Sequence, residues 1–175
     1  MKQVILFVII ALSAISVTPH VAAQAVNPVV AVCFTSGYGS KSNCASLIIY
    51  WIQRANSTIH ILIYSFTLAS ITSALVAAKN RGVDVQIVMD HAQSKEASSQ
   101  YPNLNQTGLQ VRLSNNAFEM HDKLAVIDGH VVLTGSFNWT NDANSNNDEN
   151  LLVLDNRTTA ALYEQEFQLV WNAAA

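Results

Sequence analysis

Residues 120–140 read "MHDKLAVIDGHVVLTGSFNWT" and contain the turn that organises the second half of the chain. The pair Asp128-Gly129 is a strong hairpin signal, and apolar runs at 124–127 and 131–133 flank it on either side. We therefore predict two antiparallel strands joined by a two-residue turn. Both strands are apolar near the turn and polar at the open end, so the polar residues there need an explanation.

The register of this hairpin decides which polar side chains meet. A two-residue turn pairs Lys123 with Thr134 and His121 with Ser136. Side chains alternate between the two faces of a strand, which places Lys123 on the same face as His121 and Ser136. Asn138 continues this face if the strand extends that far. Directly opposed residues lie about 4.5–5.5 Å apart, so the pattern predicts a cluster of polar groups at the open end.

The chemistry of this cluster favours an anion. A lysine beside a histidine repels cations, whereas lysine, serine and asparagine all donate to anionic oxygens. Histidine can act as a nucleophile or a proton donor near neutral pH. A serine-hydrolase site is the competing chemistry, but Ser136 lacks a Gly-x-Ser-x-Gly turn. The net charge of −3 means that local charge, such as that of Lys123, must hold any anionic substrate.

The rest of the chain alternates between apolar strands and amphipathic helices. Strands are expected at 28–34, 57–66, 83–90, 109–114 and 149–155, and helices at 43–56, 69–82 and 158–172, with a short helix within 91–108. This order predicts an α/β domain with a mixed, largely parallel central sheet and helices on both faces. Ligands bind at the carboxyl ends of strands in such sheets, which makes Asp90 and His91 candidates, although an ordinary polar strand end explains them better.

The first 25 residues are typical of a secretory signal peptide. Lys2 precedes an apolar run at 4–17, and Ala23-Gln24-Ala25 fits a cleavage site. The run is shorter than the ~20 residues that span a bilayer. We expect cleavage of 1–25, a single mature domain at 26–175, and export to the periplasm or the medium without stable membrane insertion. An uncleaved anchor is the alternative.

Export changes the expectation for Cys33 and Cys44, the two cysteines of the chain. In an oxidising compartment they are expected to form one disulfide that closes a short loop. Two buried free thiols are the alternative. No CxxC or paired-histidine pattern accompanies them, so we expect no metal site here.

The polar residues of the hairpin also match a known signature. The run His121-x-Lys123-x4-Asp128-x6-Gly135-Ser136 resembles the HxK(x)4D(x)6GS signature of the phospholipase D superfamily. Asn138 extends the likeness to GSxN, and Glu149 resembles the acidic residue that follows in the family. Residues 64–67 and 74–90 take part in the likeness as well. The chain is similar in particular to the small exported bacterial endonucleases that carry one such motif per chain.

The resemblance implies a phospholipase D-like fold and an active site that two subunits of a homodimer share. One His121 would attack the phosphorus, and the histidine of the second subunit would protonate the leaving oxygen. Lys123, Ser136 and Asn138 would hold the phosphate oxygens. Glu149 would hydrogen-bond to the imidazole and orient it.

Asp128 and Gly135 are expected to support the fold from within the motif, and no cofactor or metal is implied. Three functions remain open. The first is a sequence-nonspecific endonuclease that hydrolyses DNA, with RNA as a further candidate. The second is a phospholipid phosphodiesterase, for which Phe118, Phe137 and Trp139 are candidates for an apolar rim. These aromatic residues are equally suited to stacking on bases or to packing in the core. The third is a catalytically silent binding module, which the complete motif disfavours.

Overall fold

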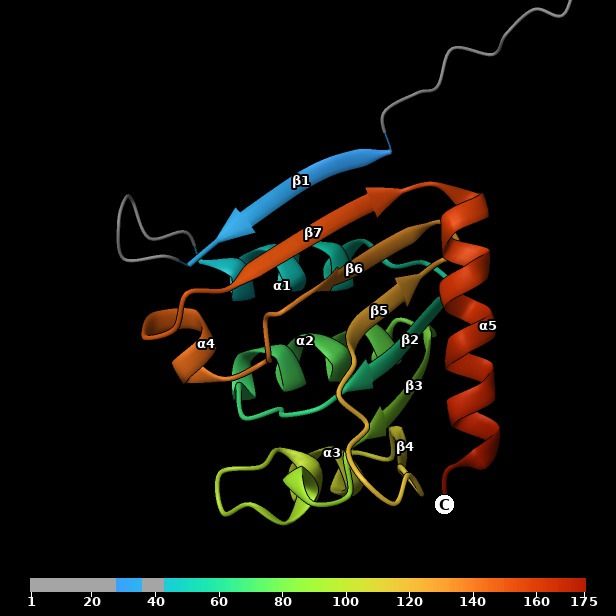
Figure 1. The fold of residues 1–175 in the computed structure, drawn as a ribbon. Coiled ribbons are helices and arrows are strands. Elements are labelled where there is room, and N and C mark those ends of the chain that lie inside the picture. Colours follow the sequence, from blue (N-terminus) through green and yellow to red (C-terminus); the bar gives the residue numbers. More distant parts are fainter. Residues whose placement is uncertain (1–27, 36–42) are drawn as a thin grey trace, which may run out of the picture.

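The structure, a computed structural model, describes residues 28–35 and 43–175. Within these ranges the chain forms a seven-stranded sheet with helices on both faces (Figure 1). The elements are β1 (Val29–Phe34), α1 (Cys44–Arg54), β2 (Thr58–Ile63), α2 (Ala69–Asn80), β3 (Asp84–Met89), the 3₁₀ turn η1 (Gln93–Lys95), α3 (Tyr101–Gln106), β4 (Gln110–Leu113), β5 (Lys123–Ile127), β6 (Val131–Gly135), α4 (Asn141–Ser145), β7 (Asn150–Asp155) and α5 (Arg157–Ala173). The predicted signal peptide lies outside the described residues. No helix among those described is both long and apolar enough to cross a membrane.

The strands lie in the order β1-β7-β6-β5-β2-β3-β4. The mixed α/β class is confirmed, but parallel pairing is limited, within the described ranges, to β2–β3 and β3–β4. The pairs β1–β7, β7–β6, β6–β5 and β5–β2 are antiparallel, which corrects the expectation of a largely parallel sheet. The reason is that β2 is joined to its neighbour β3 through α2, and β3 to its neighbour β4 through α3, as parallel pairs require. The connection through α1 joins β1 to β2, which are not neighbours in the sheet, and the chain reverses direction between β5, β6 and β7.

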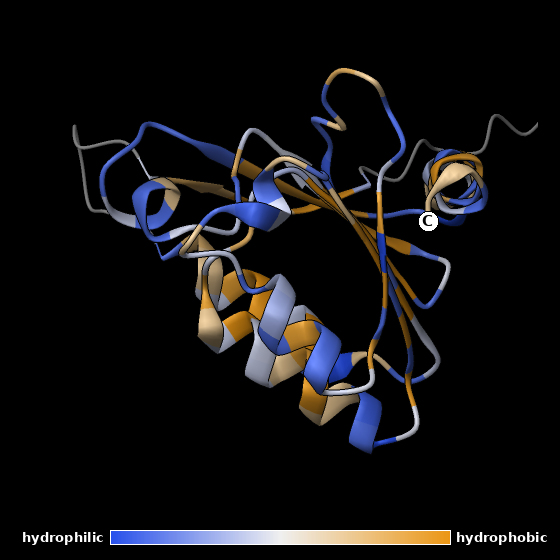
Figure 2. Ribbon diagram, turned by 90° about the horizontal axis from the view of Figure 1, so that it is seen from below, coloured by the Kyte–Doolittle hydropathy of each residue, from blue (hydrophilic) through white to orange (hydrophobic). Residues whose placement is uncertain are grey.

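Each face of the sheet carries its own apolar layer. Helices α1 and α2 cover one face, where Ile48 and Leu75 belong to the same buried cluster as Ile61 of β2. Helix α5 covers the other face, where Phe167 clusters with Leu62. Figure 2 shows α5, recognisable by the C-terminus, on one side of the sheet, and helices with apolar flanks on the other. Alternation along β2 sends neighbouring residues to opposite layers, so the strand is apolar on both faces apart from Thr58 and His60.

The turn between β5 and β6 has three residues instead of two. Ile127 pairs with Val131, and Leu124 pairs with Thr134. The predicted register, in which Thr134 faced Lys123, is therefore wrong by one position. The turn still begins at the predicted Asp-Gly pair, and both of these residues have positive φ.

Long-range contacts of the turn residues explain the extra residue. The Asp128 carboxylate accepts hydrogen bonds from three consecutive backbone N–H groups, those of residues 56–58, which lead into β2. The Nδ1 atom of His130 lies 2.9 Å from Oδ1 of Asp155 at the end of β7. The two ends of the turn are thus tied to different neighbours in the sheet. A local turn signal carries no information on such contacts.

Cys33, near the end of β1, and Cys44, the first residue of α1, form a disulfide, and their Cα atoms lie 5.7 Å apart. Both cysteines are buried. Because β1 is an edge strand paired with β7, the disulfide links this edge of the sheet to the layer of helices.

Candidate active site

Five strand ends that carry polar residues meet at the end of the sheet nearest α4 (Figure 1). Tyr64 follows β2, Asp90 follows β3, Lys123 begins β5, Ser136 follows β6 and Glu149 precedes β7. The starts of β5 and β7 coincide with the ends of β2, β3 and β6 because the former two strands run in the opposite direction. The catalytic and phosphate-binding residues predicted from the sequence therefore come to one end of the sheet.

Tyr64, His121 and Lys123 form the first cluster of the site. The phenol ring of Tyr64 and the imidazole of His121 have centroids 4.3 Å apart and planes inclined by 54°. Lys123 Nζ lies 4.7 Å from the centroid of the Tyr64 ring and donates a hydrogen bond of 2.6 Å to the backbone carbonyl of His121. The Tyr64 hydroxyl donates to Glu119 (3.1 Å) and accepts from Gln93 Nε2 (3.3 Å). Tyr64 is thus held at its hydroxyl and supports both motif residues with its ring.

Burial changes the proton affinity of two groups in this cluster. Lys123 is only 8% exposed, and burial lowers the pKa of its ammonium, while Asp122, Glu149 and Glu119 act in the opposite direction. Burial and the Glu119 carboxylate raise the pKa of Tyr64, so the phenol stays neutral at physiological pH. A partly desolvated lysine attracts an anion more strongly than one in bulk water.

Ser136 and Glu149 form the second cluster. The Ser136 hydroxyl donates to one carboxylate oxygen of Glu149 and accepts a hydrogen bond of 3.1 Å from the backbone N–H of Asn150. The side-chain amide of Asn147 donates to the other carboxylate oxygen at 3.1 Å. The one-position shift of the hairpin removes Ser136 from its predicted place opposite His121. Glu149 orients the serine in this structure, and its role beside the imidazole stays a prediction.

Gly135 allows β6 and β7 to approach each other closely beside this cluster. Its φ is 148°, and a Cβ at this position would lie 2.3 Å from the carbonyl oxygen of Asn150. The backbone N–H groups of Ser136 and Phe137 both donate to that same carbonyl oxygen. The motif glycine thus makes room for the strand that follows Glu149.

Asn138 is positioned by the segment after β2. Its side-chain oxygen accepts a hydrogen bond of 3.3 Å from the backbone N–H of Ser65, so the amide nitrogen is the part that can donate to a ligand. Its neighbours Phe137 and Trp139 are 1% and 2% exposed. They belong to the core, which is one of the three alternatives left open for them and excludes them from an apolar rim. Phe118 is 90% exposed and therefore remains a candidate for an apolar rim.

Two further aspartates accept backbone hydrogen bonds that hold neighbouring segments in place. Asp128 lies at the turn end of β5, away from Lys123. Burial alone would raise the pKa of its carboxyl, but the hydrogen bonds from residues 56–58 lower this pKa to about 2. Asp90 is buried and accepts a hydrogen bond of 3.0 Å from the backbone N–H of Met120, directly before His121. It therefore anchors the segment that carries the histidine.

Two clefts open beside the first cluster. One, of about 380 Å³, is lined by His121, by Met120 and by Leu169 and Val170 of α5. The other, of about 490 Å³, is lined by Tyr64 and mainly by hydroxyl, amide and carboxylate groups, including that of Asn138. Since the rings of His121 and Tyr64 contact each other, they mark the border between a partly apolar cleft and a polar one.

Sequence reasoning left several residues of this site unassigned. The sequence motif includes Tyr64 only as part of a similar segment and Asn150 only as the neighbour of Glu149, and it includes neither Thr35 nor Asn147. These residues lie close to strand ends at the same end of the sheet as the motif, and this position is the signal that could have identified them. Within the described ranges, no group of three or more His, Cys, Asp or Glu residues is arranged to hold a metal ion.

A mixed sheet that gathers histidine, lysine, and hydroxyl and amide donors at one end defines a phospholipase D-like domain. The chain belongs to the phospholipase D superfamily, because the family model described as "Cardiolipin synthase, PLD-like domain" matches residues 48–171. The fold therefore agrees with the resemblance carried by the hairpin motif.

Curated relatives include a mitochondrial cardiolipin hydrolase of Xenopus tropicalis, 36% identical over 126 residues, which are 72% of this chain and 60% of the relative. A phospholipase D of Rickettsia prowazekii (strain Madrid E) is 33% identical over 138 residues, which are 79% of this chain and 65% of the relative. The chain thus spans less than two thirds of the length of these relatives.

Two solved bacterial structures match the chain over more of their own length. Nuc of Salmonella typhimurium, a phospholipase D family member, has a TM-score of 0.75 and 35% identity, and the match covers 83% of this chain and 95% of Nuc. NucT of Helicobacter pylori has a TM-score of 0.68 and 28% identity, with coverage of 74% and 88% respectively.

Proposed function

We propose that the protein is an exported phosphodiesterase that hydrolyses DNA without sequence preference, with RNA as a further candidate substrate. The observation that carries this proposal is that the motif residues predicted to react with or bind the phosphate lie together at one end of the sheet. The similarity to Nuc over nearly the whole length of that chain supports an enzyme of the same kind.

The proposed reaction proceeds in two steps. An imidazole nitrogen of His121 attacks the phosphorus, a nitrogen–phosphorus bond forms, and the bond from phosphorus to the leaving oxygen breaks. A second histidine gives its proton to the leaving oxygen. This histidine then removes a proton from water, which attacks the phosphorus and releases His121.

The second histidine is proposed to come from a second copy of the chain. Each motif supplies one His121, whereas the reaction needs a nucleophile and an acid on opposite sides of the phosphorus. His60 is buried under α5 and paired with Glu164, and His130 lies at the turn end of the hairpin. His91 is exposed after β3 at the same end of the sheet as the motif, and the variant His91→Asn described below tests it directly. A symmetric dimer that brings two copies of the site together would supply the missing group.

Lys123 and Asn138 are the proposed phosphate ligands within each copy. The ammonium of Lys123 would neutralise a non-bridging oxygen, and the Asn138 amide would donate a hydrogen bond. The Ser136 hydroxyl donates its hydrogen bond to Glu149 in this structure. To bind a phosphate oxygen, the hydroxyl must rotate so that its proton points toward the substrate. With two lysines per shared site, the proposed mechanism uses no divalent metal.

The test is cleavage of supercoiled plasmid in the presence of EDTA, alongside hydrolysis of bis(p-nitrophenyl) phosphate. We expect both reactions to proceed, and we expect His121→Asn to abolish both while its circular dichroism stays unchanged. His91→Asn, which changes an exposed histidine beside β3, is the matched control and should keep most of the activity. Intact plasmid together with hydrolysis of the small diester would rule out the nuclease and keep the phosphodiesterase.

A phospholipid phosphodiesterase is the second candidate, and one observation favours it. The cleft that contains His121 has an apolar side formed by Leu169 and Val170, and Leu169 is 68% exposed. Relatives named cardiolipin hydrolase and phospholipase D support this alternative. Release of the head group from phospholipid vesicles, measured beside plasmid nicking at equal enzyme concentration, distinguishes the two substrates.

A further inference from the structure

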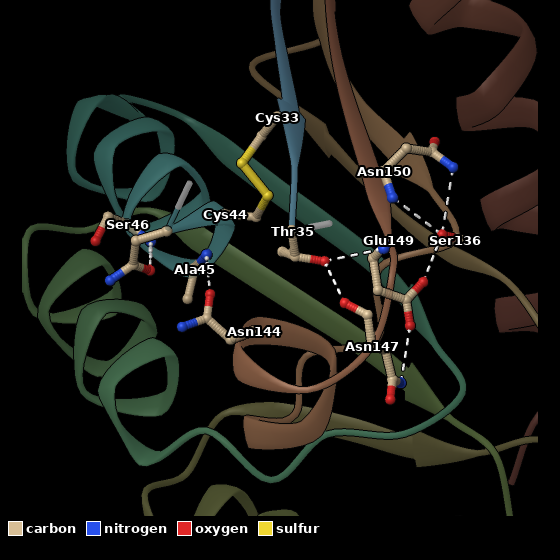
Figure 3. The surroundings of a disulfide bond; sticks show 11 residues. Cys33, Thr35, Cys44, Ala45, Ser46, Ser136, Asn144, Asn147, Glu149 and Asn150 are labelled. Carbon is tan, nitrogen blue, oxygen red and sulfur yellow. Dashed lines mark hydrogen bonds between the residues drawn. A yellow bond between two sulfur atoms is a disulfide. The ribbon is translucent and has the colours of Figure 1, made fainter. Parts of the chain in front are cut away.

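Thr35, the residue after β1, is joined to the segment before β7 through both its backbone and its side chain (Figure 3). Its backbone N–H donates to the carbonyl oxygen of Glu149 (3.1 Å), and its Oγ1 accepts from the backbone N–H of Glu149 (2.9 Å). The same hydroxyl donates to the carbonyl oxygen of Asn147 (2.9 Å). Thr35 is 2% exposed, so these hydrogen bonds are shielded from water.

The two residues that Thr35 holds are the ones that orient the motif serine. The side-chain amide of Asn147 donates to one oxygen of the Glu149 carboxylate, and the other oxygen accepts the proton of Ser136. A displacement of the Thr35 hydroxyl would therefore move the backbone of both groups. Its effect would reach Ser136 through the carboxylate.

The disulfide fixes Thr35 from the other side. Cys33 lies two residues before it, and its bond to Cys44 ties the end of the edge strand to the first turn of α1. The next residue of that helix, Ala45, donates its backbone N–H to the side-chain oxygen of Asn144 in α4 (3.2 Å). The segment from α4 to Glu149 is thus attached at both ends to the two elements that the disulfide connects (Figure 3).

We propose that Thr35 is a positioning residue for the Glu149–Ser136 pair and that the Cys33–Cys44 disulfide keeps it in place. Hydrolysis then depends on the oxidised state of the two cysteines as well as on the motif. This inference rests on the proposed phosphodiesterase function of the same site. The alternative is a disulfide that only stabilises the fold, with Thr35 as an ordinary buried hydroxyl.

The variant Thr35→Val separates these two explanations, because it keeps the shape and the disulfide and removes only the hydroxyl. With bis(p-nitrophenyl) phosphate as substrate, we expect kcat to fall about tenfold with KM changed by less than about twofold. Thr35→Ser should restore kcat to within about twofold of the unaltered protein. The double variant Cys33→Ala/Cys44→Ala should lose kcat to a similar extent as Thr35→Val.

The matched control is Thr107→Val. Thr107 directly follows α3, and its partly buried hydroxyl, which this variant removes, donates to the carbonyl oxygen of Leu104 within the helix. This variant should leave both kinetic constants unchanged. An unchanged kcat in Thr35→Val would overturn the proposal, and so would a loss confined to the double cysteine variant, since the disulfide would then act without Thr35.

Hydrogen exchange gives a readout that does not depend on any activity. The backbone N–H of Glu149 should exchange faster in Thr35→Val and in the double cysteine variant, while the amides of β2 and β3 keep their protection. Unchanged exchange at Glu149 would overturn the positioning role. If the unaltered protein hydrolyses no phosphodiester, the proposed function fails, and the exchange rates alone decide whether Thr35 holds this segment.

Discussion

The phenol ring of Tyr64 lies against the imidazole of His121, with the ring centroids 4.3 Å apart. The same ring lies beneath the ammonium of Lys123, at 4.7 Å. One aromatic side chain from the end of β2 thus supports both reactive residues of the motif, which come from the start of β5. This first cluster of the site is therefore built from two neighbouring strands of one chain.

Replacement of this ring tests its role. Tyr64→Ala should lower kcat for bis(p-nitrophenyl) phosphate by about tenfold or more, because His121 and Lys123 lose their common support. Tyr64→Phe keeps the ring and removes the hydroxyl that bonds to Glu119, so it should stay within about threefold of the unaltered protein. Equal kinetics for all three proteins would show that the ring contact has no part in catalysis.

The pH dependence of activity should report Lys123. The ammonium must be protonated to bind phosphate, and burial lowers the pKa of Lys123 from its ordinary value of 10.5. The alkaline limb of the profile of kcat/KM should therefore fall at a lower pH than that of an ordinary lysine. Lys123→Arg should move this limb to higher pH, since arginine stays charged. A limb that does not respond to this substitution belongs to another group.

Asp128 should affect stability and not turnover. The pKa of about 2 in the folded state lies below the ordinary 3.8, so the ionised carboxylate stabilises the fold above about pH 4. This contribution is lost as the pH falls toward 2. Asp128→Asn should lower the free energy of unfolding by about 1–2 kcal/mol at pH 7, after allowance for solvent screening. Denaturant titrations should show a smaller difference at pH 3, and a constant difference would contradict this explanation.

Gly135 and Gly129 offer a matched comparison within one hairpin. In Gly135→Ala the new Cβ would lie 2.3 Å from the Asn150 carbonyl oxygen, so β7 must move away. We expect a clear loss of thermal stability and of activity. Gly129 has a φ of 65° and no heavy atom within 4 Å of an added Cβ, so Gly129→Ala should cost only about 1–2 kcal/mol of backbone strain and keep activity. Thermal denaturation and kinetics of both variants check this contrast.

Most elements of the fold could be predicted because they have a strong local pattern, whereas the polar run at 140–150, interpreted as a loop, contains the short helix α4. The apolar run before Tyr64 and the helical spacing around Ile48 both appear in the structure where the sequence placed them. The hairpin register could not be predicted in this way. It depends on the bonds of Asp128 to residues 56–58 and of His130 to Asp155, which join distant parts of the chain.

For the site as well, local sequence patterns predicted some features and long-range contacts determined the others. The motif spacing indicated which residues gather, because strand ends follow from the pattern of apolar runs. The partners of Ser136 and Glu149 could not be predicted, since they depend on side-chain directions at the end of β6 and on the corrected register. The pattern left a rim, base stacking and the core open for Phe137 and Trp139, and their place beside the helical layer buries them.

The central claim is that His121 forms a covalent bond to the phosphorus of a nucleic acid. The most direct measurement is mass spectrometry of protein that is denatured in alkali during turnover of a DNA oligonucleotide in EDTA. We predict a DNA fragment joined through phosphorus to the peptide that contains His121, and no such adduct in His121→Asn. Turnover of the oligonucleotide without an adduct on His121, or with an adduct on another residue, would contradict the account.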